Sequence, residues 1–341
     1  MRTIAVLNQK GGVGKTTTAV NVAAALAEAG QKVAVIDLDP QAHLTIHLGV
    51  EPQTIEAGAY DVLAQSADFR ASLMLVRPNL WLLAANLDLI GAETELINVV
   101  GREIILREAM QASQDQFDFC LIDCPPSLSV LSINALAAAQ EVLIPLQPHF
   151  LALQGFGKLL QTVDVVNRRI NPHLKVTGVL LCMNDTRASL SNEVRADIER
   201  FLQSARGSNN AWAEAEILPT FIRRNIKLAE APSYGQTIFE YDPTCNGAED
   251  YRKVAKFLLG IDEAQTPEPA PPAVTLELQG DSPAQVPPAT PPIPIATVNL
   301  PAPRCYSPVP IWTEPAASAP EPIPPELQTG LPAETPHAPH D

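Results

Sequence analysis

The stretch Lys10-Gly-Gly-Val-Gly-Lys-Thr-Thr17 decides the fold of this chain, because it joins a predicted strand to a predicted helix. Residues 3–7 before it form a short apolar run of the strand type, and residues 18–28 after it form an alanine-rich helix that Gly30 closes. Glycines at positions 11, 12 and 14 let the backbone curl so that successive N–H groups point inward, and the start of the helix adds its partial positive charge. The stretch therefore predicts a phosphate-binding loop.

In such a loop Lys15 reaches the β- and γ-phosphates of a nucleotide, and the hydroxyl of Thr16 ligates Mg²⁺. The usual pattern G-x-x-x-x-G-K-[ST] is not met, because Gln9 stands at the first glycine position. A dinucleotide-binding G-x-G-x-x-G is absent too, since Thr17 stands at its last position. The predicted nucleotide contacts in the loop are Gly11, Gly12, Val13, Gly14, Lys15, Thr16 and Thr17.

The additional lysine at position 10 makes the stretch resemble the deviant Walker A motif of the ParA/MinD ATPases, and the resemblance extends over nearly all of residues 3–259. It implies a homodimer that encloses two ATP molecules, in which Lys10 crosses the interface to the partner's nucleotide and neutralises phosphate charge. The alternative for Lys10 is a basic residue on an exposed loop.

Two acidic motifs follow apolar runs of the parallel-strand type. Residues 32–36 lead into Asp37-Leu-Asp39-Pro-Gln41, and the resemblance implies that Asp37 holds Mg²⁺ through water while Asp39 orients the attacking water. Residues 119–123 have the form of a Walker B strand, so Asp123 is expected to hold Mg²⁺ through water. Acids that end strands as solvated loop residues are the alternative.

Further strands are predicted at residues 80–84, 141–145 and 175–183, and one helix at residues 89–112. Alternation of strands and helices predicts an α/β fold of the P-loop NTPase type, a mostly parallel sheet with helices on both faces. Met183 and Asn184, which end the last long strand, are expected beside the adenine.

The resemblance also implies residues that bind double-stranded DNA without reading its sequence. Arg187 stands at one such position, and Arg223 replaces a proline of the family pattern at another. Basic side chains can hold the DNA backbone, although a solvated charged face is the alternative. The predicted DNA contacts are Arg187, Arg223, Arg224, Lys227, Arg252, Lys253 and Lys256.

Proline and charge divide the chain in two. Of 33 prolines, 22 lie after residue 261, and this part carries −9 of the net charge of −15. We expect an ATPase domain at residues 1–261 and a proline-rich, acidic, disordered tail at residues 262–341. Residues 304–312 hold its aromatic side chains and are either a docking peptide for an unknown partner or part of a spacer.

The sequence thus predicts a Mg²⁺-dependent ATPase that drives chromosome or plasmid partitioning with a ParB-like, centromere-binding partner. No apolar run is long enough to span a membrane, so we expect a cytoplasmic, nucleoid-associated protein with no membrane partner. The same switch acting on a protein assembly, or cycling on the membrane as in MinD, is an alternative. Another is an iron–sulfur protein of the same superfamily, with Cys120 and Cys124 as candidate ligands.

Overall fold

The computed structural model describes residues 1–149, 152–185 and 189–261. Three predictions fall outside these ranges: the tail at residues 262–341, its boundary with the ATPase domain, and the DNA contact at Arg187.

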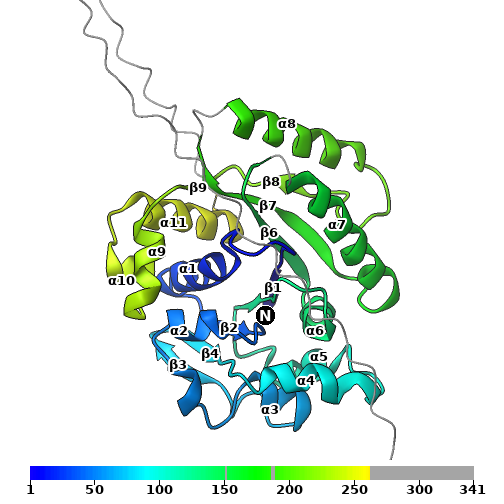
Figure 1. Ribbon diagram of the computed structural model, residues 1–341, viewed down its shortest axis with the longest axis vertical. Helices are drawn as coiled ribbons and strands as arrows, with labels where there is room; N and C mark the ends of the chain where they lie inside the picture. The colour runs from blue at the N-terminus through cyan, green and yellow to red at the C-terminus, as the bar shows by residue number, and fades with distance from the viewer. Residues whose placement is uncertain (150–151, 186–188, 262–341) are drawn as a thin grey trace, which may run out of the picture. The chain divides into compact units, whose positions relative to one another are not determined.

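A parallel sheet forms the centre of the described part, with strand order β3-β4-β2-β5-β1-β6-β7-β8 and with β9 paired to β7 (Figure 1). Every neighbouring pair is parallel except β3 and β4. The central strands are buried along their length, as apolar runs predict for strands covered on both faces. The strands are β1 (Arg2–Val6), β2 (Val33–Asp37), β3 (Met74–Arg77), β4 (Leu80–Leu83), β5 (Phe119–Asp123), β6 (Glu141–Leu146), β7 (Lys175–Asn184), β8 (Glu216–Ile217) and β9 (Ile222–Arg223).

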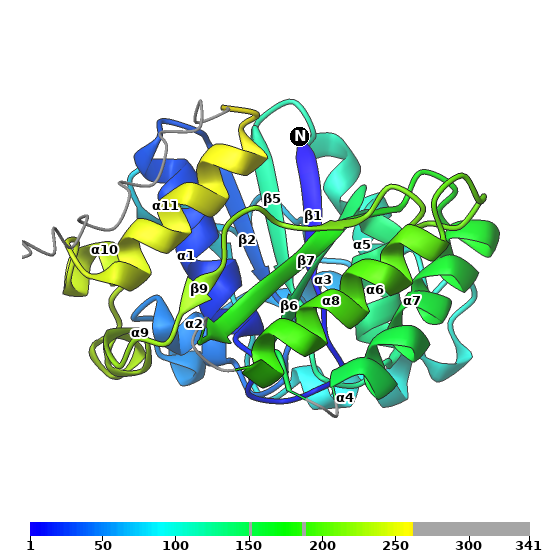
Figure 2. The same cartoon turned by 90° about the horizontal axis from the view of Figure 1, so that it is seen from above.

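Helices cover both faces of the sheet (Figure 2). One hydrophobic core lies between the sheet and α1, α2, α10 and α11, and a second core lies between the sheet and α3 to α8. The predicted α/β fold is therefore confirmed. The helices are α1 (Lys15–Glu28), α2 (His43–His47), α3 (Ala59–Ala64), α4 (Leu89–Glu95), α5 (Ile105–Met110), α6 (Val130–Ala138), α7 (Ala152–Arg169), α8 (Ser189–Ser204), α9 (Lys227–Glu230), α10 (Ile238–Tyr241) and α11 (Asn246–Leu258).

The prediction of one continuous helix at residues 89–112 is wrong. The chain forms α4 and a short 3₁₀ turn, leaves the helical path, and resumes as α5 at Ile105. Gly101 lies in the interruption with φ of 77°, a left-handed conformation that ends regular helix. Apolar residues continue at helical spacing on both sides because both pieces pack on the same core.

Candidate ATP- and magnesium-binding site

The phosphate loop connects β1 to α1, and two of its glycines adopt conformations that other residues rarely take. Gly12 has φ of 73° and Gly14, the N-cap of α1, has φ of 92°. Any side chain at these positions would strain the loop. The helix begins at Lys15, three residues before the predicted start, so the first amides of the helix follow the glycines directly. The loop thus presents N–H groups and the helix N-terminus to an anion.

Lys15 is buried at the base of this loop. Its ammonium donates a hydrogen bond to the backbone oxygen of Lys10 at 3.2 Å. Burial lowers the pKa of Lys15 below its usual value, while the charges of Asp123 and Asp39 act in the opposite direction. A lysine that has lost its water and has carboxylates nearby binds a phosphate group at little further desolvation cost.

Asp37 and Asp123 end neighbouring strands and are fully buried. Asp37 accepts hydrogen bonds from the amide of Thr45 at 2.9 Å, the Thr45 hydroxyl at 2.8 Å and the amide of Asp39 at 3.1 Å. Despite these bonds, burial raises the pKa of Asp37 to about 6. Three protein donors therefore already hold this carboxylate, which fits the predicted contact of Asp37 with Mg²⁺ through water.

Asp123 contrasts with Asp37, because neither of its carboxylate oxygens has a hydrogen-bond partner among the described residues. Burial raises its pKa well above the usual range, although the Thr16 hydroxyl and the Lys15 charge favour the ionised form. A buried carboxylate without partners beside a hydroxyl fits Mg²⁺ with its bound waters. Thr16 and Asp123 would therefore hold the ion, with Asp37 adding negative charge behind them.

Asp39 lies two residues beyond β2 and lines the large cavity described below, as do Lys15 and Thr16. Its carboxylate accepts a hydrogen bond from the amide of Gln41 at 3.0 Å, which fixes the side chain. One carboxylate oxygen carries that bond and the other is available to a ligand or water in the cavity.

The cavity has a volume of about 1160 Å³ and extends from the phosphate loop towards β7 and β9. Met183 lines it, whereas Asn184, the other predicted adenine neighbour, is not among its lining residues. The lining also includes Cys182, Ile222 and Tyr251, which sequence reasoning missed as cavity residues. They carry no local signal, because they reach the cavity only when β7, β9 and α11 pack together.

Lys10 does not line this cavity. Its side chain is exposed and lines a separate hollow of about 200 Å³ together with Asn8, Gln147 and His149. The Lys10 ammonium contacts the Nε2 atom of His149, and the Lys10 amide donates to the Asn8 side chain at 3.0 Å. Burial and the Lys10 charge lower the pKa of His149, which keeps this histidine neutral near pH 7. Because Lys10 lines this separate hollow, it is not part of the wall of the large cavity in its own subunit.

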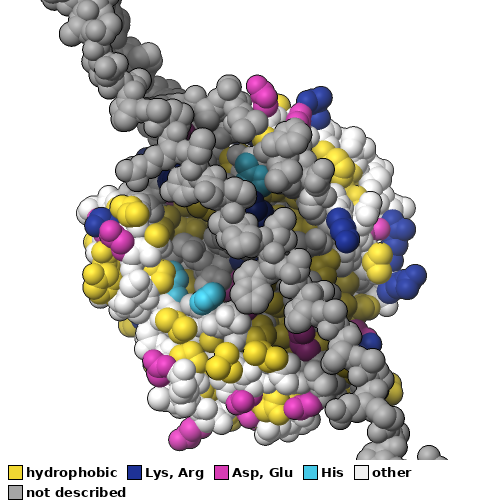
Figure 3. Space-filling view, in the orientation of Figure 1, with side chains coloured by type: hydrophobic (Ala, Val, Ile, Leu, Met, Phe, Trp, Pro, Cys, Tyr) yellow, Lys and Arg dark blue, Asp and Glu magenta, His cyan; other side chains and the backbone are white. Residues whose placement is uncertain are grey.

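Most of the predicted basic cluster is paired with acids. Arg223 bonds Asp250 and Glu249, Lys227 bonds Glu230, Arg252 bonds Glu28 and Lys253 bonds Glu249. At the left and upper edges of the view in Figure 3, Lys and Arg side chains likewise lie directly beside acidic ones.

Arg224 differs from these residues, since it is exposed and makes no ion pair within the described residues. Lys256, unlike Arg224, makes an interaction within the described part of the protein. Four of the six described members of the predicted cluster thus have an acidic partner, which offsets much of the positive charge of the cluster. The assignment of these residues to DNA stays a prediction.

The two cysteines considered for the iron–sulfur alternative are fully buried, with Cys120 inside β5 and Cys124 just after it. Burial raises the pKa of Cys124 well above the usual range for a thiol. Across the described ranges, no group of three or more His, Cys, Asp or Glu side chains is placed to hold a metal ion. Helices in the same ranges are too short or too polar to cross a membrane.

A phosphate loop on a parallel sheet, with a buried acid at each of two neighbouring strand ends, defines a P-loop ATPase that uses ATP and Mg²⁺. Residues 1–176 match the family model described as an AAA domain. The sporulation initiation inhibitor protein Soj of Bacillus subtilis is 41% identical over 254 residues, which covers 74% of this chain and 96% of Soj. The chromosome partitioning protein ParA of Myxococcus xanthus is 38% identical over 78% of this chain and 90% of its own.

Among solved structures, the cobyrinic acid a,c-diamide synthase of Mycobacterium smegmatis, with bound ADP and magnesium, is 37% identical with a TM-score of 0.64. The match covers 76% of this chain and 94% of that one. On these findings the chain belongs to the Soj/ParA family of ATPases.

Proposed function

We propose that this ATPase forms a dimer around two ATP molecules, binds DNA without sequence preference in that state, and leaves the DNA when hydrolysis separates the subunits. Such a cycle positions a replicon, and a ParB-like protein on the centromere stimulates the hydrolysis. The proposed place of action is the cytoplasm, on the nucleoid.

The observation that carries the proposal is the position of Lys10. Its side chain is exposed, lies outside the wall of the ATP cavity and lines a separate hollow. An exposed lysine beside the phosphate loop, outside the wall of the cavity in its own subunit, can reach the nucleotide of a second subunit. This supports the dimer, and the names of the relatives Soj and ParA support a role in partitioning.

The proposed catalytic steps use residues of both subunits. Lys15 and the loop amides hold the phosphates, and Thr16, Asp37 and Asp123 hold Mg²⁺, which neutralises the charge on the phosphates. Asp39 accepts a hydrogen bond from the attacking water and orients it. Lys10 of the second subunit neutralises the charge that develops during phosphoryl transfer.

Light scattering of the full chain with Mg²⁺ and a hydrolysis-resistant ATP analogue tests the dimer. We expect twice the subunit mass with the analogue and a single subunit with ADP, and retention on DNA of arbitrary sequence only with the analogue. The mass of a single subunit under both conditions would contradict the proposed dimer. A dimer that does not bind DNA would support the ATP-dependent dimerisation but contradict the proposed binding to the nucleoid.

A further inference from the structure

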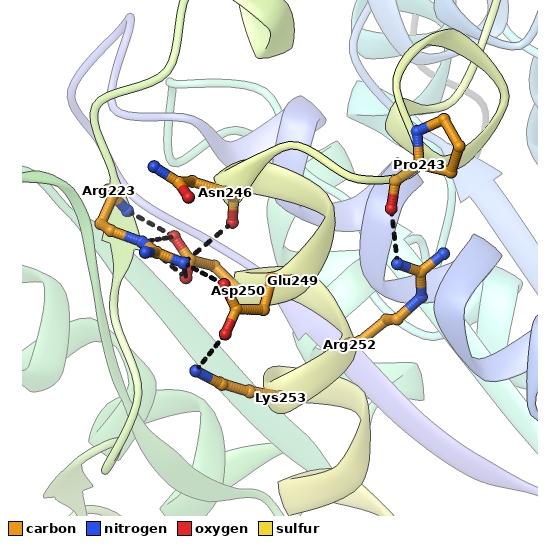
Figure 4. A network of polar contacts seen from close by, with 7 residues as sticks. All are labelled: Arg223, Pro243, Asn246, Glu249, Asp250, Arg252 and Lys253. Atoms are coloured by element: carbon orange, nitrogen blue, oxygen red, sulfur yellow. Dashed lines mark hydrogen bonds and ion pairs between the residues drawn. The ribbon is translucent and has the colours of Figure 1, made fainter. Parts of the chain in front are cut away.

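Helix α11 contacts two walls of the ATP cavity through consecutive residues. The hydroxyl of Tyr251 lies 3.2 Å from the hydroxyl of Thr18, one turn into the helix that follows the phosphate loop. The preceding residue, Asp250, bonds Arg223 in β9 (Figure 4). Both Tyr251 and Arg223 line the cavity. One helix therefore fixes the phosphate loop and the β9 wall relative to each other.

The bond between Asp250 and Arg223 is extensive. The carboxylate of Asp250 accepts the backbone N–H of Arg223 at 2.9 Å, its Nε at 3.0 Å and its Nη2 at 2.6 Å. The Asp250 side chain is only 4% exposed. Charge-assisted bonds at a buried carboxylate are stronger than neutral ones, so this contact holds both the side chain and the backbone of β9.

Glu249 strengthens the same arrangement. Its carboxylate accepts Nη2 of Arg223 at 2.7 Å and the ammonium of Lys253 at 2.9 Å (Figure 4). These two partners lower the pKa of Glu249 to about 2. Hydrogen bonding to Asp250 raises the pKa of Arg223 in turn, so the guanidinium stays charged and paired.

The wall that this network fixes lies on the opposite side of β1 from the magnesium-site acids. The buried acids come from β2 and β5, on one side of β1 in the strand order, whereas β7 and β9 lie on the other side. With the phosphates on the loop and Mg²⁺ beside β5, the nucleoside of a bound ATP would extend towards β7 and β9. There Arg223 pairs in register with Asn184, next to the cavity residue Met183.

We propose that Arg223 and Asp250 act as a brace that sets the position of the β9 wall against the nucleoside, which makes Arg223 a positioning residue for ATP rather than a contact to DNA. A proline at position 223, as in the family pattern, has neither the N–H nor the guanidinium that Asp250 accepts. A chain with proline at position 223 could therefore not form the brace.

The test compares a ligand that has a nucleoside with one that lacks it. ATP and inorganic tripolyphosphate are titrated with Mg²⁺ into the full chain carrying Arg223→Ala or Asp250→Asn, tripolyphosphate as a competitor of a fluorescent ATP analogue. We expect the dissociation constant of ATP to rise about tenfold in each variant, because a loosened wall no longer meets the nucleoside. The affinity for tripolyphosphate stays unchanged, since the loop is intact.

Asp164 provides a matched control on the opposite face of the sheet. It is a nearly buried carboxylate that accepts the amide of Ala211 at 3.2 Å and pairs with Arg168 at 2.6 Å, as Asp250 does with Arg223. Asp164→Asn should lose stability without any change in ATP affinity. The double variant of Arg223 and Asp250 should weaken ATP binding no more than either single variant, because both remove one interaction.

Parent-like ATP affinity in Arg223→Ala would overturn the brace. So would an equal loss of ATP and tripolyphosphate affinity, or an equal effect of Asp164→Asn on ATP, since each points to general destabilisation. If Asp250→Asn does not fold, Arg223→Lys decides alone. This variant keeps the positive charge but loses the planar guanidinium. Weaker affinity for ATP with unchanged affinity for tripolyphosphate would support the brace, and parent-like affinity for ATP would overturn it.

Discussion

Asp37 and Asp123 lie directly opposite each other on the parallel strands β2 and β5, and both are fully buried. Three hydrogen bonds from protein donors reach Asp37, and none from the described residues reaches Asp123. Burial raises the pKa of both carboxylates above the usual range, so their ionisation is costly in the ligand-free protein. A bound Mg²⁺ would offset this cost.

That cost predicts a pH dependence of stability in the ligand-free protein. Burial raises the pKa of Asp37 from 3.8 to about 6, so the folded state binds its proton more tightly than the unfolded state. The resulting stabilisation is complete below the unfolded value and is lost as the pH rises through about 6. Urea unfolding in EDTA should show the parent gaining about 1 kcal/mol over Asp37→Asn between pH 8 and pH 5. Parallel pH profiles of the two proteins would contradict this.

Lys15→Ala should weaken ATP binding by at least about a hundredfold, because the only buried ammonium beside the phosphate loop in the described ranges is removed. Isothermal titration with Mg²⁺-ATP measures the loss. Lys32→Ala is the matched control, since Lys32 is an exposed lysine that precedes β2. The ligand-free Lys15→Ala protein should unfold at the parent temperature or above it, as a desolvated charge is gone. Parent-like ATP affinity would exclude Lys15 from the site.

Asp39→Ala should bind ATP and accumulate as an ATP-bound dimer, because the attacking water loses the carboxylate that orients it. Turnover should fall by at least about a hundredfold, measured as phosphate release, while light scattering reports the dimer. Hydrolysis at the parent rate would show that Asp39 does not position the water.

Lys10→Gln should keep parent-like ATP affinity and lose hydrolysis, because Lys10 lines a hollow separate from the ATP cavity. Mixing this variant with Asp39→Ala before adding ATP shows which subunit's nucleotide it serves. In a mixed dimer, the Lys10→Gln subunit keeps its own Asp39 and receives Lys10 from its partner, so one site regains activity. No recovery in the mixture would mean that Lys10 acts within its own subunit.

Arg224→Ala should weaken retention on DNA, because Arg224 is the exposed arginine of the predicted cluster that has no ion pair within the described ranges. The slope of log affinity against log salt should fall by about one unit for one lost phosphate contact. Arg70→Ala removes an exposed arginine far along the chain, in the turn after α3, and should leave the slope unchanged. Equal slopes for Arg224→Ala and the parent would remove Arg224 from the DNA surface.

Prediction from sequence was most accurate where a local backbone requirement or a strand end fixes the chemistry. β5 has the predicted bounds, and β2 ends at Asp37, so both acids could be placed at the carboxyl edge of the sheet. The break between α4 and α5 was missed, because apolar residues continue at helical spacing on both sides of the interruption that contains Gly101. The antiparallel strand β3 was missed as well, although residues 74–76 form a short apolar run, because three apolar residues alone do not distinguish a strand from a loop.

The charge of the basic cluster shows most clearly what the sequence alone cannot predict. Arg223 lies 27 residues from Asp250, and Arg252 lies 224 residues from Glu28, yet each pair is in direct contact. A count of arginines and lysines along the chain cannot show that acids distant in sequence neutralise them. For the same reason the sequence does not reveal that Tyr251 and Arg223 border the ATP cavity.

By itself, the sequence determined the phosphate loop, the acids at the strand ends and the alternation of strands with helices, because each depends on the conformations and polarity of adjacent residues. Only the tertiary structure decided which charges are paired, which residues border the cavity, and that Lys10 lies outside the cavity wall. Those properties arise from contacts between elements that are far apart in the chain, and they exist only once the sheet and its two helical layers have packed together.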